Sequence, residues 1–187
     1  MKPADYPHVK ICCISSTIEA DLAIKYGASA IGLVGKMPSG PGVISDELIA
    51  EIAASVPGDI DTFLLTSETT AEGIINHHRK VNTSTIQIVD RIDTEAYRTL
   101  RNKLPAIKLV QVIHVLDENS VTEAAMYAEY ADALLLDSGN PSLAVKQLGG
   151  TGRTHNWELS LKIREVVNVP IYLAGGINPA NVKDAFN

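Results

Sequence analysis

Two ionisable side chains stand where buried strands of this chain are expected to end. Cys12 closes an apolar run near the N-terminus, and Asp137 closes another such run much later in the sequence. A thiol whose surroundings lower its pKa becomes a base, and a carboxyl group kept protonated by its site becomes an acid. The pair therefore predicts general acid–base chemistry. By position alone, a small buried apolar residue also fits Cys12, and a turn residue ahead of 138–141 also fits Asp137.

Two glycine-rich stretches follow later apolar runs and predict a phosphate site. They are Gly149-Gly150-Thr151-Gly152-Arg153 and Gly175-Gly176. Glycine lets backbone N–H groups approach an anion with no Cβ in the way. A pair of tight turns is the plainer alternative. The Arg153 guanidinium either adds charge at the phosphate or lies in solvent.

The histidines are weaker candidates. His77 and His78 fall on an expected helix, where adjacent side chains point apart, so we expect surface residues rather than ligands. His114 comes late in an apolar run. Its side chain either faces the pocket or packs elsewhere. His155 follows the first glycine-rich stretch, and we expect it to help line the site.

The elements that must position these residues alternate in type along the chain. Expected strands are Val9–Cys13, Ala30–Gly35, Thr62–Thr66, Thr85–Val89, Lys108–Val115, Asp132–Asp137 and Pro170–Ala174. Their continuous apolar character is typical of strands covered on both faces. Expected helices are Thr17–Tyr26, Asp46–Ser55, Thr70–Lys80, Thr94–Lys103, Ser120–Tyr130, Glu158–Val167 and Pro179–Phe186. Ser16 or Thr17, Ser45, Asn156 and Asn178 are expected N-caps.

Seven β-then-α units predict a parallel sheet with helices outside it. An open doubly wound sheet and a closed barrel both fit this order. Short, even units and the absence of a GxGxxG fingerprint after the first strand favour a (β/α)8 TIM barrel in one domain, residues 1–187. Because such a barrel has eight units, we expect the native protein to continue for about 30 residues, one further unit.

Composition narrows the class of protein. Sixteen basic and 22 acidic residues give a net charge of −6, which argues against nucleic acid or an anionic membrane as the partner. The two cysteines are adjacent, so they are poorly placed for a disulfide and too few for a zinc site. No apolar leader or membrane-length segment is evident in the sequence. These features predict a reduced, cytoplasmic protein.

The chain resembles phosphoribosylanthranilate isomerases in several motifs. Lys10-Ile11-Cys12 resembles their first strand, and 27–34 their second unit. The strongest resemblance is 132–137 followed by 149–154 and Asn156-Trp157, and 173–182 is similar to the seventh unit. Their order and spacing agree over nearly the whole chain.

The resemblance implies an Amadori rearrangement of N-(5′-phosphoribosyl)anthranilate, a step of tryptophan biosynthesis, without metal or organic cofactor. It assigns Asp137 as the acid that protonates the ribose ring oxygen, and Cys12 as the base that removes the C2′ proton. The implied partner is a small phosphorylated sugar, bound by a monomer or a homodimer.

Several positions depart from the family pattern. Cys13 stands where the family usually has glycine, and 38–43 has no arginine to meet the anthranilate carboxylate. Gln87-Ile88-Val89-Asp90 replaces Gln-Leu-His-Gly, and 138–148 is longer than expected. Lys36 and Arg91 are possible replacements for the missing cation.

Three functions remain open at this point. The first is the isomerase itself, and the second is a related isomerase acting on another phosphoribosyl or ketose phosphate. The third is a non-catalytic phosphate-binding protein or a subunit of a larger assembly. A Schiff-base aldolase is disfavoured because Lys108 begins its strand, whereas such a lysine belongs late in one.

Overall fold

The central strands form because their residues are mostly apolar on both faces and are covered on both. In the computed structural model, which describes residues 8–186, every residue of β2 and β6 is buried. The strands are β1 Lys10–Ile11, β2 Ala30–Val34, β3 Asp61–Thr66, β4 Thr85–Ile88, β5 Lys108–His114, β6 Ala133–Asp137 and β7 Ile171–Leu173. They pair in chain order, and every pairing is parallel.

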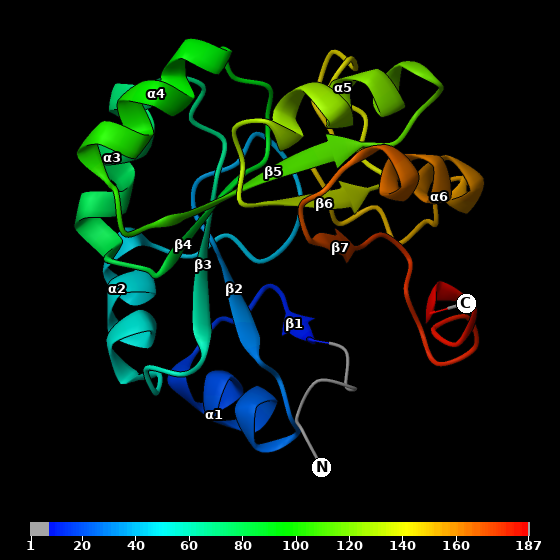
Figure 1. Ribbon diagram of the computed structural model, residues 1–187. Helices are drawn as coiled ribbons and strands as arrows, with labels where there is room; N and C mark the ends of the chain where they lie inside the picture. The colour runs from blue at the N-terminus through cyan, green and yellow to red at the C-terminus, as the bar shows by residue number, and fades with distance from the viewer. Residues whose placement is uncertain (1–7, 187) are drawn as a thin grey trace.

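The sheet curves so that its helices lie on the outer face and its C-terminal strand ends meet on one side (Figure 1). Within residues 8–186, β1 and β7 lie at the two edges and each pairs with one neighbour. The expectation of a barrel-type α/β fold built from seven parallel units is confirmed. None of the described helices is both long and apolar enough to span a bilayer.

Five of the six described helices begin at an N-cap residue whose side chain accepts a hydrogen bond from a free backbone N–H group, and Glu118 is the exception. They are α1 Thr17–Lys25, α2 Asp46–Ser55, α3 Ala71–Val81, α4 Thr94–Lys103, α5 Asn119–Ala128 and α6 Trp157–Val166. The Ser16 hydroxyl accepts from the Glu19 N–H, and the Ser45 hydroxyl from the Leu48 N–H. The side chain of Asn156 caps α6. These three expected N-caps are confirmed.

The prediction of a helix over Pro179–Phe186 is wrong. Residues 179–183 form turns, and only Asp184–Phe186 is helical, as the short 3₁₀ segment η2. The Asn178 side chain does accept from the Ala180 N–H, as an N-cap would. Most of 177–184 is exposed, however, so little apolar burial supports a costly helix nucleus there.

The first strand is shorter than expected. Regular pairing ends at Ile11, and Cys13 takes a positive φ of 61°. The chain rejoins its neighbour at Ile14, whose N–H donates to the Gly32 carbonyl at 3.1 Å. Cys12 and Cys13 therefore form a detour at the end of β1 rather than its last two rungs.

Side-chain alternation along the strands separates two layers of core. Ile31 and Leu33 point toward the helices, whereas Ala30 and Val34 belong to an inner cluster with Phe63. Gly32, between them, also faces inward and leaves space there. Several residues of the inner layer also line the pocket described below.

The helix-facing layer should dominate stability. Leu64 is fully buried, so Leu64→Ala should lower the free energy of unfolding by about 2–5 kcal/mol in urea denaturation. Leu116 is 46% exposed, and Leu116→Ala should change the free energy of unfolding by no more than about 0.5 kcal/mol. Equal losses in the two variants would contradict the assigned core.

Candidate active site

A pocket of about 240 Å³ opens at the C-terminal ends of the strands. Its lining residues come from β1 and the residues after it, from β2, β3, β4 and β6, and from the loops after β2, β4, β6 and β7. Lys10, Cys12, Cys13 and Asp137 are its ionisable lining groups. The structure thus brings together two side chains that stand far apart in the sequence.

Cys12 lies among protein atoms at the end of β1, yet solvent reaches it through the open pocket. The pKa of its thiol is lowered to about 6, mainly because the Cys13 thiol hydrogen-bonds to its sulfur. Burial opposes this change, and the Lys10 ammonium supports it. At neutral pH the Cys12 side chain is consequently a thiolate, which is the form that acts as a base.

Lys10 reaches the same place from within β1. A Cβ at Gly32 would lie 2.8 Å from the Cys12 Sγ and 3.1 Å from the Lys10 Nζ, so both atoms occupy the space that this glycine leaves free. The ammonium also lies 5.1 Å from the centre of the Phe63 ring. Sequence reasoning missed Lys10, although residues two apart on a strand share a face and its spacing from Cys12 was the signal.

Asp137 is the last residue of β6 and is only 8% exposed. Its Oδ1 accepts the Ser138 N–H at 2.7 Å. Its Oδ2 accepts no hydrogen bond within residues 8–186 and lies beside the Gly149 backbone in the pocket. One oxygen is therefore fixed, while the other has no protein partner among the described residues.

Glycines allow the two loops to close around this carboxylate. A Cβ at Gly175 would lie 2.9 Å from the Asp137 Oδ1 and 3.1 Å from the Arg153 carbonyl, and Gly175 has a φ of 82°. A Cβ at Gly149 would lie 2.9 Å from the Asp137 Oδ2. Any larger residue at either position would displace the acid or the loop.

Most of the expected phosphate-binding residues line the pocket. They are Gly149, Gly150, Thr151, Gly152, Gly175 and Gly176. The Thr151 hydroxyl contacts the Ser138 hydroxyl at 2.6 Å, which ties the first loop to the end of β6. Arg153 is not among the lining residues, and its side chain is exposed. Its backbone packs against Gly175 and Gly176 instead.

The prediction that His77 and His78 are surface residues is wrong. His78 is 5% exposed and its Nε2 contacts the Thr83 carbonyl at 2.8 Å. His77 bridges two elements, with Nδ1 at 2.9 Å from the Thr66 hydroxyl and Nε2 at 3.1 Å from Asp46. Adjacent helix positions point apart, but here one packs inward and the other packs against α2 and β3.

His114 and His155, which the sequence placed near the pocket, do not line it. His114 lies beside Asp137 in the strand register, but its Nε2 bonds the Val89 carbonyl at 2.9 Å and its ring does not line the pocket. His155 contacts the Ser160 hydroxyl at 2.6 Å, and burial lowers its pKa. It too lies outside the pocket lining.

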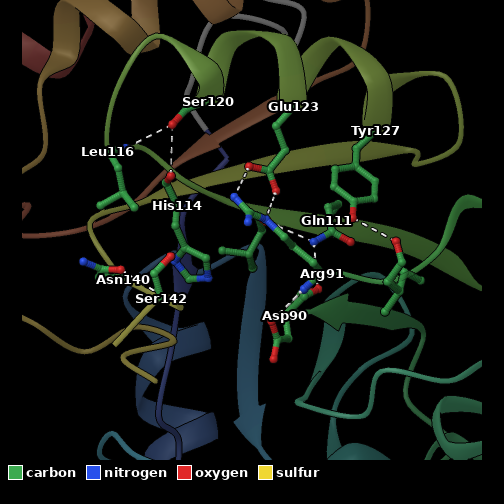
Figure 2. Close-up of polar contacts among 12 residues, drawn as sticks. Asp90, Arg91, Gln111, His114, Leu116, Ser120, Glu123, Tyr127, Asn140 and Ser142 are labelled. Carbon is green, nitrogen blue, oxygen red and sulfur yellow. Dashed lines mark hydrogen bonds and ion pairs between the residues drawn. The ribbon is translucent and has the colours of Figure 1, made fainter. Parts of the chain in front are cut away.

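The rim on the β4 side is held by ion pairs. Figure 2 shows the Arg91 side chain directed at Glu123 of α5, with contacts of 2.6 and 2.7 Å. Asp90, which is buried, pairs with Lys146 from the β6–α6 loop. The Lys146 carbonyl in turn accepts a hydrogen bond from Ser39 of the β2–α2 loop.

The long segment after β6 forms a small hairpin over this rim. Asn140 and Gln147 form an antiparallel bridge, with N–H to carbonyl distances of 2.7 and 3.0 Å. Leu148 is buried in the inner cluster. The extra length seen in the sequence thus links three loops across the pocket mouth.

Comparison with known proteins places this geometry in a family. A family model of N-(5′-phosphoribosyl)anthranilate (PRA) isomerase matches residues 9–187. This chain belongs to the PRA isomerase family. A PRA isomerase of Haloarcula marismortui is 32% identical over 178 residues, which cover 95% of this chain and 79% of that protein.

Solved PRA isomerases share the fold as well. The isomerase of Thermotoga maritima superimposes with a TM-score of 0.79 and 27% identity, covering 97% of this chain and 82% of its own. A second PRA isomerase was solved in complex with reduced 1-(o-carboxyphenylamino)-1-deoxyribulose 5-phosphate. It superimposes with a TM-score of 0.77 and 25% identity, and the match covers 97% of this chain and 81% of that one. The PRA isomerase resemblance drawn from the sequence motifs is therefore confirmed.

The position of Lys10 predicts how the reactivity of Cys12 depends on pH. Alkylation of Cys12 by iodoacetamide should rise with pH through a midpoint near 6, because the thiolate is the reacting form. Lys10→Met should move this midpoint upward, since the neighbouring positive charge is lost. Lys36→Met, which removes a lysine outside the pocket lining, should leave it in place. A midpoint unchanged by Lys10→Met would exclude the electrostatic role.

The enclosure of Asp137 predicts a difference between two glycine substitutions. Gly175→Ala should lower kcat/KM for PRA about 10²-fold, because the new Cβ displaces the carboxylate. Gly27 also has a positive φ, 94°, but nothing within 4 Å of an added Cβ. Gly27→Ala should cost about 1–2 kcal/mol of stability and leave kcat/KM unchanged. Equal kinetic losses in both variants would show that backbone strain, not displacement of Asp137, is responsible.

Proposed function

We propose that this protein catalyses the Amadori rearrangement of N-(5′-phosphoribosyl)anthranilate to 1-(2-carboxyphenylamino)-1-deoxyribulose 5-phosphate, a step of tryptophan biosynthesis. The observation that carries the proposal is the pocket in which a thiolate at the end of β1 and a buried carboxyl group at the end of β6 share one cavity with two glycine-rich loops. Family membership supplies the reaction class.

The first step is opening of the ribose ring. The protonated Asp137 Oδ2 gives its proton to the ring oxygen, the C1′–O bond breaks, and the nitrogen lone pair forms an iminium with C1′. The hydrogen bond from the Ser138 N–H to Oδ1 holds the carboxyl group in a single orientation. Proton donation by such a fixed acid contributes about 10²–10⁴-fold to the rate.

The second step is removal of the C2′ proton by the Cys12 thiolate. The electron pair of the C2′–H bond moves to form the C1′–C2′ double bond of an enolamine and neutralises the iminium. The enolamine then becomes the ketone when its C2′ hydroxyl loses a proton and C1′ gains one. The thiolate suits this role because its lowered pKa keeps it charged at neutral pH.

The phosphate belongs at the loops after β6 and β7. Gly149, Gly150, Gly152, Gly175 and Gly176 line the pocket and carry no side chain that would shield a backbone N–H group from an anion. Anchoring the phosphate there would hold the sugar between Cys12 and Asp137, as the two proton transfers require. Arg153, being exposed beside this loop, would contribute long-range charge rather than a pocket contact.

One observation favours a second candidate function. Among the described residues that line the pocket, Lys10 is the single lysine or arginine, and it stands beside Cys12. Arg91 is held by Glu123, and Lys146 by Asp90, so neither is free to meet the anthranilate carboxylate. A related isomerase whose phosphoribosyl substrate carries a different amine is therefore the alternative.

The proposal predicts that freshly prepared PRA is converted by the purified protein. Cys12→Ser and Asp137→Asn should each lower kcat/KM by about 10²–10⁴-fold while the fold is retained. Asp21→Asn, which changes an exposed carboxylate of α1, is the matched control and should keep full activity. Product formation is followed by chromatography.

The outcomes separate the two functions. No conversion of PRA by a folded protein that still binds ribose 5-phosphate would favour the alternative substrate. Full activity in Cys12→Ser or in Asp137→Asn would overturn the corresponding assignment. The T. maritima isomerase is described as dimeric, and for this protein a monomer or a homodimer remains the expectation.

A further inference from the structure

Gln87 is a buried polar residue in an otherwise apolar part of the pocket. It lies on β4, is 4% exposed and lines the pocket. Its partners in the strand register are Leu65 of β3 and Val110 of β5, which are both apolar. The Gln87 Oε1 is buried and makes no hydrogen bond within residues 8–186. A buried acceptor without a partner lowers stability, so this amide calls for a reason outside the folding of the chain.

Gln111 shows how a buried glutamine of this fold is satisfied when it serves the structure. It lies on the neighbouring strand β5 and is fully buried. Its Oε1 accepts a hydrogen bond from the Tyr97 hydroxyl at 2.6 Å. Its Nε2 donates to the carbonyls of Asp90 and Val112 at 3.1 and 2.9 Å. Gln111 does not line the pocket, whereas Gln87 does, so the glutamine with the unpartnered oxygen is the one that faces a ligand.

The Gln87 oxygen can be offered to a ligand. The last torsion of a glutamine side chain is broad, so the amide can turn its oxygen into the pocket without leaving a preferred rotamer. The strand residues that line the pocket nearby, Leu65, Val89 and Leu135, are apolar. A hydrogen bond to the oxygen is strong in such surroundings, because the local dielectric is low. The site therefore fits a hydrogen-bond donor of the ligand.

The sheet order indicates which donor of the proposed substrate would lie there. The proposed mechanism places the phosphate at the loops after β6 and β7, C2′ at Cys12 and the ring oxygen at Asp137. β4 is the middle strand of the seven, so in the curved sheet it faces the edges that hold these groups (Figure 1). C1′ is bonded to both C2′ and the ring oxygen, and the amine nitrogen on C1′ extends away from the phosphate. Its N–H is the donor directed toward Gln87.

We propose that Gln87 is a further catalytic residue, whose Oε1 accepts a hydrogen bond from the N–H of the substrate amine and stabilises the iminium formed on ring opening. The inference rests on the proposed function. When the C1′–O bond breaks, the nitrogen lone pair joins C1′ and the nitrogen becomes positive, so its N–H becomes a stronger donor. Removal of the C2′ proton neutralises the nitrogen again. No covalent bond to Gln87 forms or breaks in these steps.

The contact distinguishes the charged intermediate from the substrate. Because the hydrogen bond is stronger to the iminium than to the neutral amine, it acts on kcat more than on KM. Every phosphoribosyl derivative of a primary amine carries this N–H. The role of Gln87 therefore applies to anthranilate and equally to a different amine at the same position.

The test is the kinetics of Gln87→Met, which replaces the amide by an apolar side chain of similar length. For PRA, kcat should fall about tenfold and KM should change by less than about twofold, because a charge-assisted hydrogen bond is roughly twice as strong as a neutral one. The pH midpoint of Cys12 alkylation should stay in place, since the base is untouched. An unchanged kcat, beside a wild type that converts PRA, would overturn the inference and leave the proposed function intact. Absence of PRA conversion by the wild type would overturn the function instead.

Thermal unfolding separates this role from a structural one. Gln87→Met should be at least as stable as the wild type, because it removes a buried amide whose oxygen has no partner among the described residues. Gln111→Met should unfold at a lower temperature, since the Tyr97 hydroxyl and the Asp90 carbonyl lose their partner. Equal falls in the two variants would show that the protein itself uses the Gln87 amide, and would overturn the inference.

A change in the substrate locates the contact on the amine. The N-methyl derivative of PRA carries no N–H, so Gln87→Met should slow its conversion by less than about twofold, against about tenfold for PRA. Both rates are followed by chromatography of the products. Equal losses with the two substrates would place the Gln87 contact on another group and overturn the inference.

Discussion

Parallel pairing in chain order is the constraint on which the site depends. Because every strand runs the same way, residues that end strands gather at one edge of the sheet even when they lie far apart in the sequence. Cys12 and Asp137 meet in this manner across one cavity. The curvature of the sheet and the strand register bring the two side chains to the same cavity.

The chemistry then depends on how differently the two groups are surrounded. Cys12 sits among hydrogen-bond donors and a cation, which favour its charged form. Asp137 is buried under two glycine loops, with one oxygen bonded and the other open to the pocket. A base that is charged and an acid that is enclosed are the combination that proton transfer in opposite directions requires.

Much of this arrangement could be predicted from local signals in the sequence. Continuous apolar runs indicated the strands, and Ser16, Ser45 and Asn156 indicated helix starts, because burial and capping act within a few residues. The environment of Cys13 could not be predicted, since it depends on Gly42 from another loop. The inward packing of His78 and the hairpin that carries Lys146 likewise depend on contacts between distant segments. The prediction of a helix over Pro179–Phe186 failed for a related reason. A capping residue alone does not form a helix when the segment has no surface to pack on.

The most direct test of the account is a crystal structure of this protein with reduced 1-(o-carboxyphenylamino)-1-deoxyribulose 5-phosphate. The account predicts the phosphate at the loops that contain Gly149–Gly152 and Gly175–Gly176. It further predicts C2′ within about 3.5 Å of the Cys12 Sγ, and the oxygen that derives from the ribose ring within hydrogen-bonding distance of the Asp137 carboxyl group. A ligand bound with its C2′ facing away from Cys12, or bound outside this pocket, would contradict the central claim.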